Sequence, residues 1–405
     1  MTQPCLSVII PVYNQWPLTE RCLHSLAETS RGIDCEVIVV DNGSSDETAS
    51  ALDAVGACLF SSFFSAIHLP ENRNFGPACT LGALRARSER LFFLNNDTLL
   101  IENCLTPLIE ALESDAQLGA VGPLLLYANE TVQHAGIAFT LDGMLHLYRS
   151  FPRNHPVIAR KRYVQALTGA ALMLSRTLFV SLGGFFEGYR NGCEDVELCL
   201  RLGQAGYRLA LQPSSLVYHL ESQSAGRKAH DEENSRLLRE RVGHLLRPDY
   251  HLHALNDDFL PFVTDALDLA IRMKAEEEGA LLRRLVVAPA AVRKEMIEAN
   301  PLWISGRLFL AEQAEREQKY DLALLLRTDL AGLLQSREAY ERLLALESFV
   351  SCADQLFSDV RTELARIETI AKSPGYTRAL LEEVHKTKDT FLSALYEEKI
   401  RSLSG

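Results

Sequence analysis

The chain has 405 residues, of which 47% are hydrophobic and 23% charged, a composition typical of a globular protein long enough for two domains. Its net charge of −12 argues against a nucleic-acid partner, which would bind a basic face. No run reaches the ~20 apolar residues of a transmembrane helix, and the start, MTQPCLSVIIPVYN, does not resemble a signal peptide. Nine scattered cysteines without a CxxC pair favour a reducing compartment. We therefore expect a cytoplasmic protein, and contact with the inner face of the membrane stays open.

The N-terminal half alternates short apolar strands with helices. Leu6–Val12 (LSVIIPV) is the first predicted strand, and helices are predicted over Pro17–Thr29 and Pro77–Arg87. Four more strands are expected in CEVIVVDNGSSD, AIHLPENRNFG, RLFFLNND and GAVGPLLLY. Such alternation predicts a parallel sheet with helices on both faces, whose ligands bind beyond the carboxyl ends of the strands.

From about Ser222 the pattern becomes helical. LPFVTDALDLAIRMKAEEEGALLRRL is predicted to form one long amphipathic helix. GRLFLAEQAEREQKYDLALLLRTDL has the spacing of a helical hairpin, and Tyr320 and Ala323 resemble positions of a tetratricopeptide repeat. A plain helical bundle is the alternative. We expect an α/β domain over residues 1–255 and an all-helical domain over residues 256–405.

Asp97 follows the predicted strand RLFFL in the sequence Asn95-Asn96-Asp97. A carboxylate at this position is a suitable ligand for Mg²⁺ or Mn²⁺ bound to a diphosphate, because these ions prefer oxygen ligands and need few from protein. Turn residues after a strand are also common, so the motif alone leaves both interpretations open. Asp41 ends the second strand and Asn14 follows the first. These positions suit contacts to a nucleotide base and ribose, and turn chemistry is the alternative.

Two acids, Glu194 and Asp195, begin a predicted helix in NGCEDVELCLRLGQAGYRL. They either stabilise the start of the helix or present a general base to a hydroxyl. Farther along, His219 closes the short strand LVYH and is either a metal ligand or a structural histidine. In the loop after it, Arg227 and Lys228 either meet a diphosphate or face solvent.

Seven of these segments together resemble family 2 glycosyltransferases, and most closely the branch of bacterial rhamnosyl- and galactofuranosyltransferases. The resemblance covers roughly residues 5–255 and leaves the helical C-terminal third outside it. The matching segments are, in chain order, IIPVYN, VVDNGSSD, ENRNFGPA, FLNNDT, LTGAALMLSR…GGFFEGY, CEDVELCLR and VYHLESQSAG.

The resemblance implies a GT-A fold and an inverting, metal-dependent transfer from a nucleoside-diphosphate sugar. It implies that Asp97 and His219 bind Mn²⁺ or Mg²⁺, that Asp195 is the general base with Glu194 beside it, and that Gly169 and Ala170 line the acceptor side. The positions that it implies for binding the nucleotide sugar are Pro11, Tyr13, Asn14, Asp41, Asn74, Gly76, Asn95, Asn96 and Arg227. The donor is expected to be UDP- or dTDP-linked, because Asp41 would accept the same imide N–H from either base.

The sequence departs from the family pattern at three positions. Asn95 replaces the first acid of the DXD motif, Phe186 stands where an acid is common in GGFDE, and Thr80 replaces a frequent Asn. Asn95 cannot supply a charged ligand, which predicts weaker metal binding. At Phe186 the acid of the family pattern is missing, so no role is assigned to that position. The expected core set, Asp41, Asp97, Asp195 and His219, is complete.

Other classes of protein fit the sequence less well. A non-catalytic scaffold that binds a nucleotide sugar is the main alternative, although such a scaffold would be expected to have lost the base or the metal ligands. A processive synthase would carry membrane spans and a Gln-x-x-Arg-Trp motif, and neither Trp16 nor Trp303 follows an arginine. A nucleotidyltransferase would need a glycine-rich basic loop where IIPVYNQWP stands. The acceptor is expected to be a surface glycan, a lipid-linked glycan or a protein, and the C-terminal helices either bind it, form a homo-oligomer or support the first domain.

Overall fold

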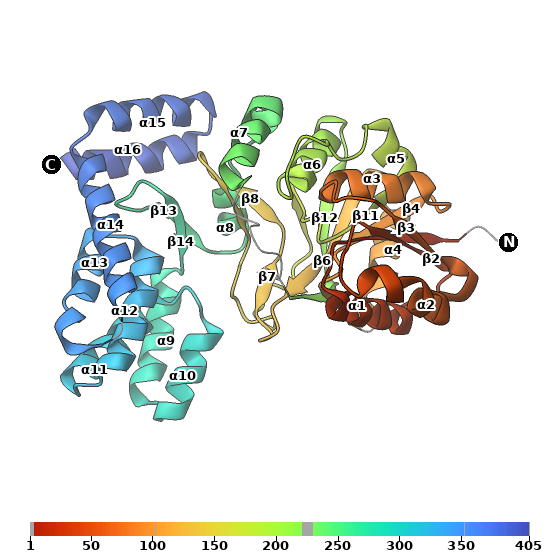
Figure 1. Ribbon diagram of the computed structural model, residues 1–405. Coiled ribbons are helices and arrows are strands. Elements are labelled where there is room, and N and C mark those ends of the chain that lie inside the picture. The colour runs from red at the N-terminus through yellow and green to blue at the C-terminus, as the bar shows by residue number, and fades with distance from the viewer. Residues whose placement is uncertain (1–3, 102, 221–229, 352, 405) are drawn as a thin grey trace. The chain divides into compact units, whose positions relative to one another are not determined.

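The computed structural model describes residues 4–101, 103–220, 230–351 and 353–404 (Figure 1). The chain forms two compact units. Unit 1 comprises Met1–Ala138 and Met144–Leu246, and unit 2 comprises Phe139–Gly143 and Arg247–Gly405. The boundary predicted after residue 255 falls inside α8 (Tyr250–Asn256), which belongs to unit 2.

Unit 1 is built on one large sheet with the strand order β10-β12-β6-β11-β4-β1-β2-β3. Its first four strands in sequence are parallel to one another: β1 (Leu6–Val12), β2 (Cys35–Asp41), β3 (Phe64–His68) and β4 (Arg90–Leu94). β1 therefore lies between β2 and β4, so that the loops after these strands meet at one edge of the sheet.

The other half of the sheet is mixed, which differs from the parallel sheet that the sequence predicted. β11 runs antiparallel between β4 and β6, and β12 runs parallel to β6 but antiparallel to β5 and β10. The physical reason is that an apolar run indicates that a strand is buried, but it does not indicate whether the strand runs parallel or antiparallel to its neighbours. These strands are β5 (Thr98–Leu100), β6 (Leu118–Leu126), β7 (Val132–His134), β10 (Arg162–Val164), β11 (Ala171–Ser175) and β12 (Arg208–His219).

Helices cover both faces of this sheet, as the sequence predicted. Side chains alternate along each strand. Val8 and Ile10 join the buried cluster formed with α1, α2 and α4, whereas Phe93 points to the other face and lies 5.0 Å, between ring centroids, from Phe179 of α5. The helices of unit 1 are α1 (Trp16–Thr29), α2 (Thr48–Phe60), α3 (Phe75–Arg85), α4 (Leu105–Ser114), α5 (Arg176–Ser181), α6 (Glu194–Gln204) and α7 (Asp231–Val242).

Unit 2 is mainly helical, and with the sheet of unit 1 it confirms the predicted class of an α/β part followed by helices. β8 (Ile137–Phe139) and β9 (Met144–His146) form a small sheet of their own where the chain passes between the units. After α8, the helices are α9 (Ala275–Val287), α10 (Ala290–Ala299), α11 (Ile304–Arg316), α12 (Tyr320–Leu334), α13 (Arg337–Leu344), α14 (Asp354–Ala371), α15 (Pro374–Lys386) and α16 (Thr390–Ser404).

The prediction of one long amphipathic helix beginning at Leu260 was wrong. The segment forms a hairpin, β13 (Leu260–Val263) and β14 (Leu269–Arg272), and only its second part is the helix α9. The backbone N–H of Thr264 donates to the carbonyl of Asp268 at 2.9 Å, and the Thr264 hydroxyl accepts from the Asp268 N–H at 3.1 Å. On either side of this turn, the apolar residues alternate between buried and half-buried positions, as expected for strands. The spacing of these residues also fits a helix, which is why the sequence alone predicted one.

The predicted helical hairpin is present as α11 and α12. Ala323 of α12 is fully buried, and Gly306 of α11 lies against Trp303, where an added Cβ would come within 2.5 Å of the indole. Glycine therefore allows α11 to lie directly against that ring. The tetratricopeptide assignment of this hairpin stays a prediction.

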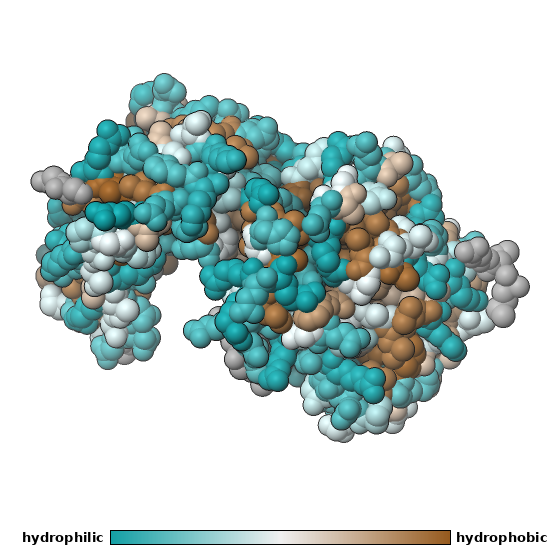
Figure 2. Space-filling view, turned by 90° about the horizontal axis from the view of Figure 1, so that it is seen from above, coloured by the Kyte–Doolittle hydropathy of each residue, from teal (hydrophilic) through white to brown (hydrophobic). Residues whose placement is uncertain are grey.

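The face shown in Figure 2 is mostly hydrophilic, with apolar side chains in separate patches. Val287, Leu325 and Leu84 are among the most exposed large apolar side chains, at 82%, 61% and 58%. None of the described helices combines the length with the apolar character that a bilayer span requires.

Candidate active site

The loops after β1 and β2 are tied together by hydrogen bonds. The Asn14 side chain accepts from the backbone N–H of Ser45 at 2.8 Å, and the Asn14 N–H donates to the Ser44 hydroxyl at 2.8 Å. Asn14 has a positive φ of 56°, which asparagine tolerates better than most residues. Of the other residues expected here, Pro11 is half-buried in β1 and the Tyr13 side chain is 49% exposed. The loop thus presents an exposed aromatic ring beside a fixed asparagine.

Asp41 lies at the carboxyl end of β2 and is 3% exposed. One carboxylate oxygen accepts the Ser44 N–H at 2.9 Å, and the other lies 2.9 Å from Nδ1 of His68, the residue that pairs with Asp41 at the end of β3. The other ring nitrogen of His68 lies 3.1 Å from Asp53. The hydrogen bond with Asp41, followed by that with Asp53, raises the pKa of His68 above its ordinary value, although burial opposes the shift.

The loop before α3 is fixed by a buried asparagine. The side-chain amide of Asn42 donates to the Asn72 side chain and to the Asn74 carbonyl, each at 3.0 Å. Asn74 has a φ of 68°, and Gly76 is buried where an added Cβ would lie 3.2 Å from the Cβ of Phe185. Asn74 and Gly76 therefore belong to the same cluster of loops as Asp41.

The segment Asn95-Asn96-Asp97 leaves β4 and turns into β5. The N–H of Asn95 donates to the carbonyl of Ala170 at 2.9 Å, which brings this segment beside the start of β11. The amide of Asn96 donates to the Thr19 hydroxyl of α1 at 2.9 Å, so this side chain supports the turn. The structure therefore gives Asn96 a structural contact and places Asp97 at the strand end.

Asp97 and His219 lie together: Oδ1 of the aspartate is 3.1 Å from Nε2 of the histidine, which is 5% exposed. Gln133 of β7 holds the ring, because its Nε2 donates to the His219 carbonyl at 3.1 Å and its Oε1 lies 2.7 Å from His219 Nδ1. An amide oxygen only accepts, so Nδ1 carries the proton and the lone pair of a neutral ring lies on Nε2. In its neutral form the ring would therefore face Asp97 with the nitrogen that can bind a metal ion.

The chemistry of this pair fits a divalent cation. A buried carboxylate oxygen and an imidazole nitrogen with its lone pair directed toward the same point form a suitable donor set for Mn²⁺, and ligands from a diphosphate would complete it. Within the described ranges, no three His, Cys, Asp or Glu side chains form a metal-binding cluster, so the pair is a partial site. Asn95, whose amide nitrogen lies 3.4 Å from His219 Nε2, adds a neutral group.

Asp195 stands in the first turn of α6, with its carboxylate directed at the start of β11. Oδ2 accepts the Gly169 N–H at 2.6 Å, and Oδ1 accepts the Val196 N–H at 2.8 Å. The backbone of Gly169 lies close to this side chain, since an added Cβ would lie 3.2 Å from the Cβ of Asp195. Glu194 is 5% exposed and accepts the Gly192 N–H at 2.7 Å, so it supports the helix start while Asp195 is half-buried.

Backbone contacts connect these groups at one edge of the sheet. Asn95 bonds to Ala170, and the neighbouring Gly169 bonds to Asp195, so the Asp97 turn and the α6 start adjoin through the two residues just before β11. β1 separates β4 from β2 and hence from Asp41. The structure thus brings Asp195, Asp97 and His219 into one region with the Asp41 loops beside it. Arg227 and Lys228 lie outside the described residues.

Sequence reasoning missed three polar residues of this region: Gln133, His68 and Asn42. His68 could have been found, because parallel register places the last residue of β3 beside Asp41. Asn42 follows Asp41 directly in the segment VVDNGSSD, and this position after a strand was its only signal. No local sequence pattern indicated a role for Gln133, because its partner His219 lies 86 residues away in the sequence.

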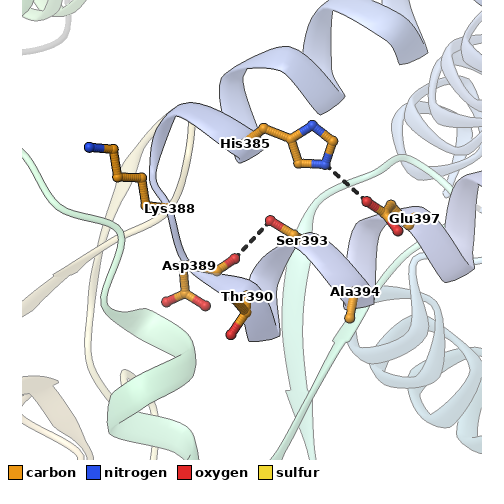
Figure 3. A pocket seen from close by; sticks show the side chains of 7 residues that line it. All are labelled: His385, Lys388, Asp389, Thr390, Ser393, Ala394 and Glu397. Carbon is orange, nitrogen blue, oxygen red and sulfur yellow. Dashed lines mark hydrogen bonds and ion pairs between the residues drawn. The ribbon is translucent and has the colours of Figure 1, made fainter.

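The described part of unit 2 holds a shallow pocket of about 290 Å³ with different chemistry (Figure 3). Its lining residues come from the end of α15, the loop after it and α16. The His385 ring points toward Glu397, 2.9 Å away, and both side chains are exposed. An exposed pair of this kind gives no buried group for catalysis, so the pocket is not part of the candidate active site.

Residues 7–166 match the family model of glycosyl transferase family 2. Over these residues, about two fifths of its length, the chain therefore resembles a family 2 glycosyltransferase domain. The matched range contains the strands that carry Asp41 and Asp97, and it ends before Asp195 and His219.

Curated relatives have glycosyltransferase names. The chain is 30% identical over 231 residues to O-antigen biosynthesis protein RfbC of Myxococcus xanthus, covering 55% of this chain and 18% of that protein. It is 28% identical over 248 residues to an N-acetylglucosaminyl-diphospho-decaprenol L-rhamnosyltransferase of Mycobacterium tuberculosis, covering 55% of this chain and 78% of that protein. The chain thus spans under a fifth of one of these relatives and most of the other.

Solved structures with some similarity include GalNAc-T7 with UDP, GalNAc and Mn²⁺, at 20% identity and a TM-score of 0.48, covering 59% of this chain and 48% of that one. A mannosyltransferase from Pyrobaculum calidifontis with GDP-Man and Mn²⁺ has 16% identity and a TM-score of 0.43, covering 91% of this chain and 87% of that one.

Proposed function

From this family 2 domain and the groups at its strand ends, we propose that the chain is an inverting glycosyltransferase. It transfers a sugar from a UDP- or dTDP-linked donor to a hydroxyl of a glycan, lipid-linked or protein acceptor. The observation that carries the proposal is the pairing of Asp97 with a His219 ring held by Gln133, at the same sheet edge as Asp195. The similarity to a named rhamnosyltransferase supports the reaction class.

Asp195 is the general base of this reaction. Its carboxylate takes the proton of the acceptor hydroxyl as that oxygen bonds to the anomeric carbon. The bond from the anomeric carbon to the diphosphate oxygen breaks, and its electron pair leaves with the nucleoside diphosphate. The N–H groups of Gly169 and Val196 hold the carboxylate in a fixed orientation, which keeps the base in line with its acceptor.

Asp97 and His219 would hold Mn²⁺ or Mg²⁺, which supplies positive charge that stabilises the leaving diphosphate. Asp41 would accept the imide N–H of uracil or thymine, because each carboxylate oxygen has two acceptor positions. Both oxygens of Asp41 already have one protein partner that fixes their direction. In this arrangement the uracil or thymine of the donor lies beside β2, and the diphosphate of the donor lies beside β4.

The test is the thermal midpoint of the purified chain against UDP, dTDP and their hexose conjugates, with and without Mn²⁺. A ligand that binds only the folded state raises the midpoint. We expect a shift that requires Mn²⁺ and disappears in Asp97→Ala, but persists in Asp34→Ala, a control at an exposed aspartate of the same unit. A folded protein with no shift for any nucleotide would contradict the proposal. Binding without turnover against any acceptor would instead identify the scaffold alternative.

A further inference from the structure

A buried carboxylate follows the proposed base on the same helix. Glu197 is 0% exposed and lies two residues after Asp195. Its partner is Arg241 of α7, whose Nη2 lies 2.9 Å from Oε1 and whose Nε lies 3.2 Å from each oxygen. Arg201 is more distant, at 3.5 Å. Because a buried charge without a partner is strongly destabilising, Glu197 ties the first turn of α6 to α7.

Arg241 also packs on an aromatic ring. Its guanidinium carbon lies 3.3 Å from the ring centroid of Phe186, in the loop that leads to α6. Phe186 is the residue that departs from the family pattern, where an acid is common. The structure explains why a phenylalanine suits this position: the face of its ring attracts the guanidinium of Arg241, which also pairs with Glu197.

A second residue of α7 holds the same loop. Asn234 is 2% exposed, and its side chain accepts the Arg190 N–H and donates to the Arg190 carbonyl, both at 3.1 Å. The next residue, Asn191, accepts the Phe75 N–H at 2.9 Å. Asn191 and Cys193 have φ values of 53° and 72°, a conformation that costs energy outside glycine and needs such support.

We propose that Arg241 and Asn234 are positioning residues that hold Asp195 in place for the acceptor hydroxyl, an inference that rests on the proposed function. The first turn of α6 is held on two sides. Asp195 bonds to Gly169 at β11 on one side, and Glu197 bonds to Arg241 at α7 on the other. Loss of the α7 contacts lets this turn rotate and moves the Asp195 carboxylate away from its acceptor.

Hydrogen exchange tests, without any substrate, whether the contacts of α7 hold the first turn of α6 in place. In Arg241→Met, we expect exchange of the Gly169 and Val196 amides to accelerate about tenfold or more, because both donate to Asp195. The matched control is Arg236→Met on the same helix, which removes only an exposed pair with Glu240. Unchanged exchange in Arg241→Met, or equal acceleration in Arg236→Met, would overturn the inference.

Turnover tests the catalytic part, with release of UDP or dTDP from the donor sugar that shifts the melting midpoint. We expect Arg241→Met to lower kcat about 10–100-fold with donor KM unchanged, and Arg241→Lys to restore part of it. In an Asp195→Asn background, Arg241→Met should have no further effect, because it acts through that carboxylate. An equal loss in both backgrounds would contradict positioning and indicate general destabilisation.

Arg241→Met leaves Glu197 buried without its main partner, and the variant could fail to fold. The double variant Arg241→Met, Glu197→Gln removes both charges of this pair, and Arg201 keeps its bonds to the carbonyls of Leu182 and Gly184. It should therefore melt closer to wild type than Arg241→Met does, while its kcat stays low. Wild-type kcat in this folded double variant would overturn the inference. If the wild-type chain turns over no nucleotide sugar, the proposed function fails, and the exchange experiment still decides whether α7 holds the α6 turn.

Discussion

The two units bury their apolar residues in different ways. In unit 1, a large cluster on one face of the sheet runs from Leu6 to Val217 in the sequence and joins α1, α2 and α4 to most strands of the sheet. In unit 2, the described core is divided into smaller clusters along successive helices, and neighbouring clusters share residues such as Leu310 and Leu324. A shared core should unfold as a whole, whereas stacked helices depend mainly on their neighbours.

The buried polar groups differ as well. Those of unit 1 gather where strands end and helices begin, as Asp41, Glu194 and His219 do. Those of unit 2 bridge one helix to the next, as Arg307 does with Asp329 and Arg327 with Glu315. We infer from this comparison that the buried polar groups at the strand ends of unit 1 serve the proposed reaction and that those of unit 2 serve packing, and four changes test it.

The largest expected effect is on activity. Asp195→Asn should lower kcat by about 10²–10⁴-fold, because an amide cannot take the proton of the acceptor. The fold should stay intact, since Asn can still accept one of the two N–H groups at this position. Asp329→Asn in unit 2 is the control, and kcat for donor turnover is the measurement. Comparable losses in both variants would show that the division between chemistry and packing is wrong.

Removal of a large buried side chain comes next. Phe92→Ala in unit 1 and Trp303→Ala in unit 2, both 0% exposed, should each cost about 3–5 kcal/mol of local stability. The first should accelerate hydrogen exchange throughout the strands of unit 1. The second should accelerate it in α9 to α12 and leave β1, β2 and β4 unchanged. Faster exchange in those strands in Trp303→Ala would mean that the two cores are coupled.

The third change is in pH. Burial, then the neighbouring His146 and His219, lowers the pKa of His134 well below its ordinary 6.5. Folded His134 is therefore neutral where the unfolded residue takes up a proton, so stability is lost as pH falls below about 6.5. The thermal midpoint should fall between pH 7 and pH 5, and less so in His134→Gln. The exposed His385→Gln in unit 2 should follow wild type, and identical profiles for all three would refute the assignment.

The smallest expected effect is at helix starts. Ser336 accepts the Ala339 N–H at the start of α13, and its change to Ala should cost about 1 kcal/mol. Ser175 caps α5 in the same way and also donates to Glu89 at 2.6 Å, so Ser175→Ala should cost more. Chemical denaturation of both variants measures the difference. A larger loss in Ser336→Ala would show that caps matter more in unit 2 than we infer.

Much of the fold could be predicted from local sequence. β1 and β2 have the expected starts, and the ends of β1 and α1 are as predicted, because β-branched runs closed by turn residues have few alternatives. α3 begins two residues earlier than expected, at Phe75, since its start is set by the Phe75 N–H bond to Asn191, 116 residues away. The hairpin β13–β14 was missed because its apolar spacing fits helix and strand alike, and only the Thr264 turn separates them.

The sequence by itself determined the residue types of the candidate site and their places after strands, since apolar runs and turn residues are local signals. Only the tertiary structure decided which of them act together. Gln133 sets the tautomer of His219 from 86 residues away, and Arg241 holds Glu197 across 44 residues. Such pairs depend on burial and direction, which arise when distant segments pack and leave no trace in the spacing of either segment.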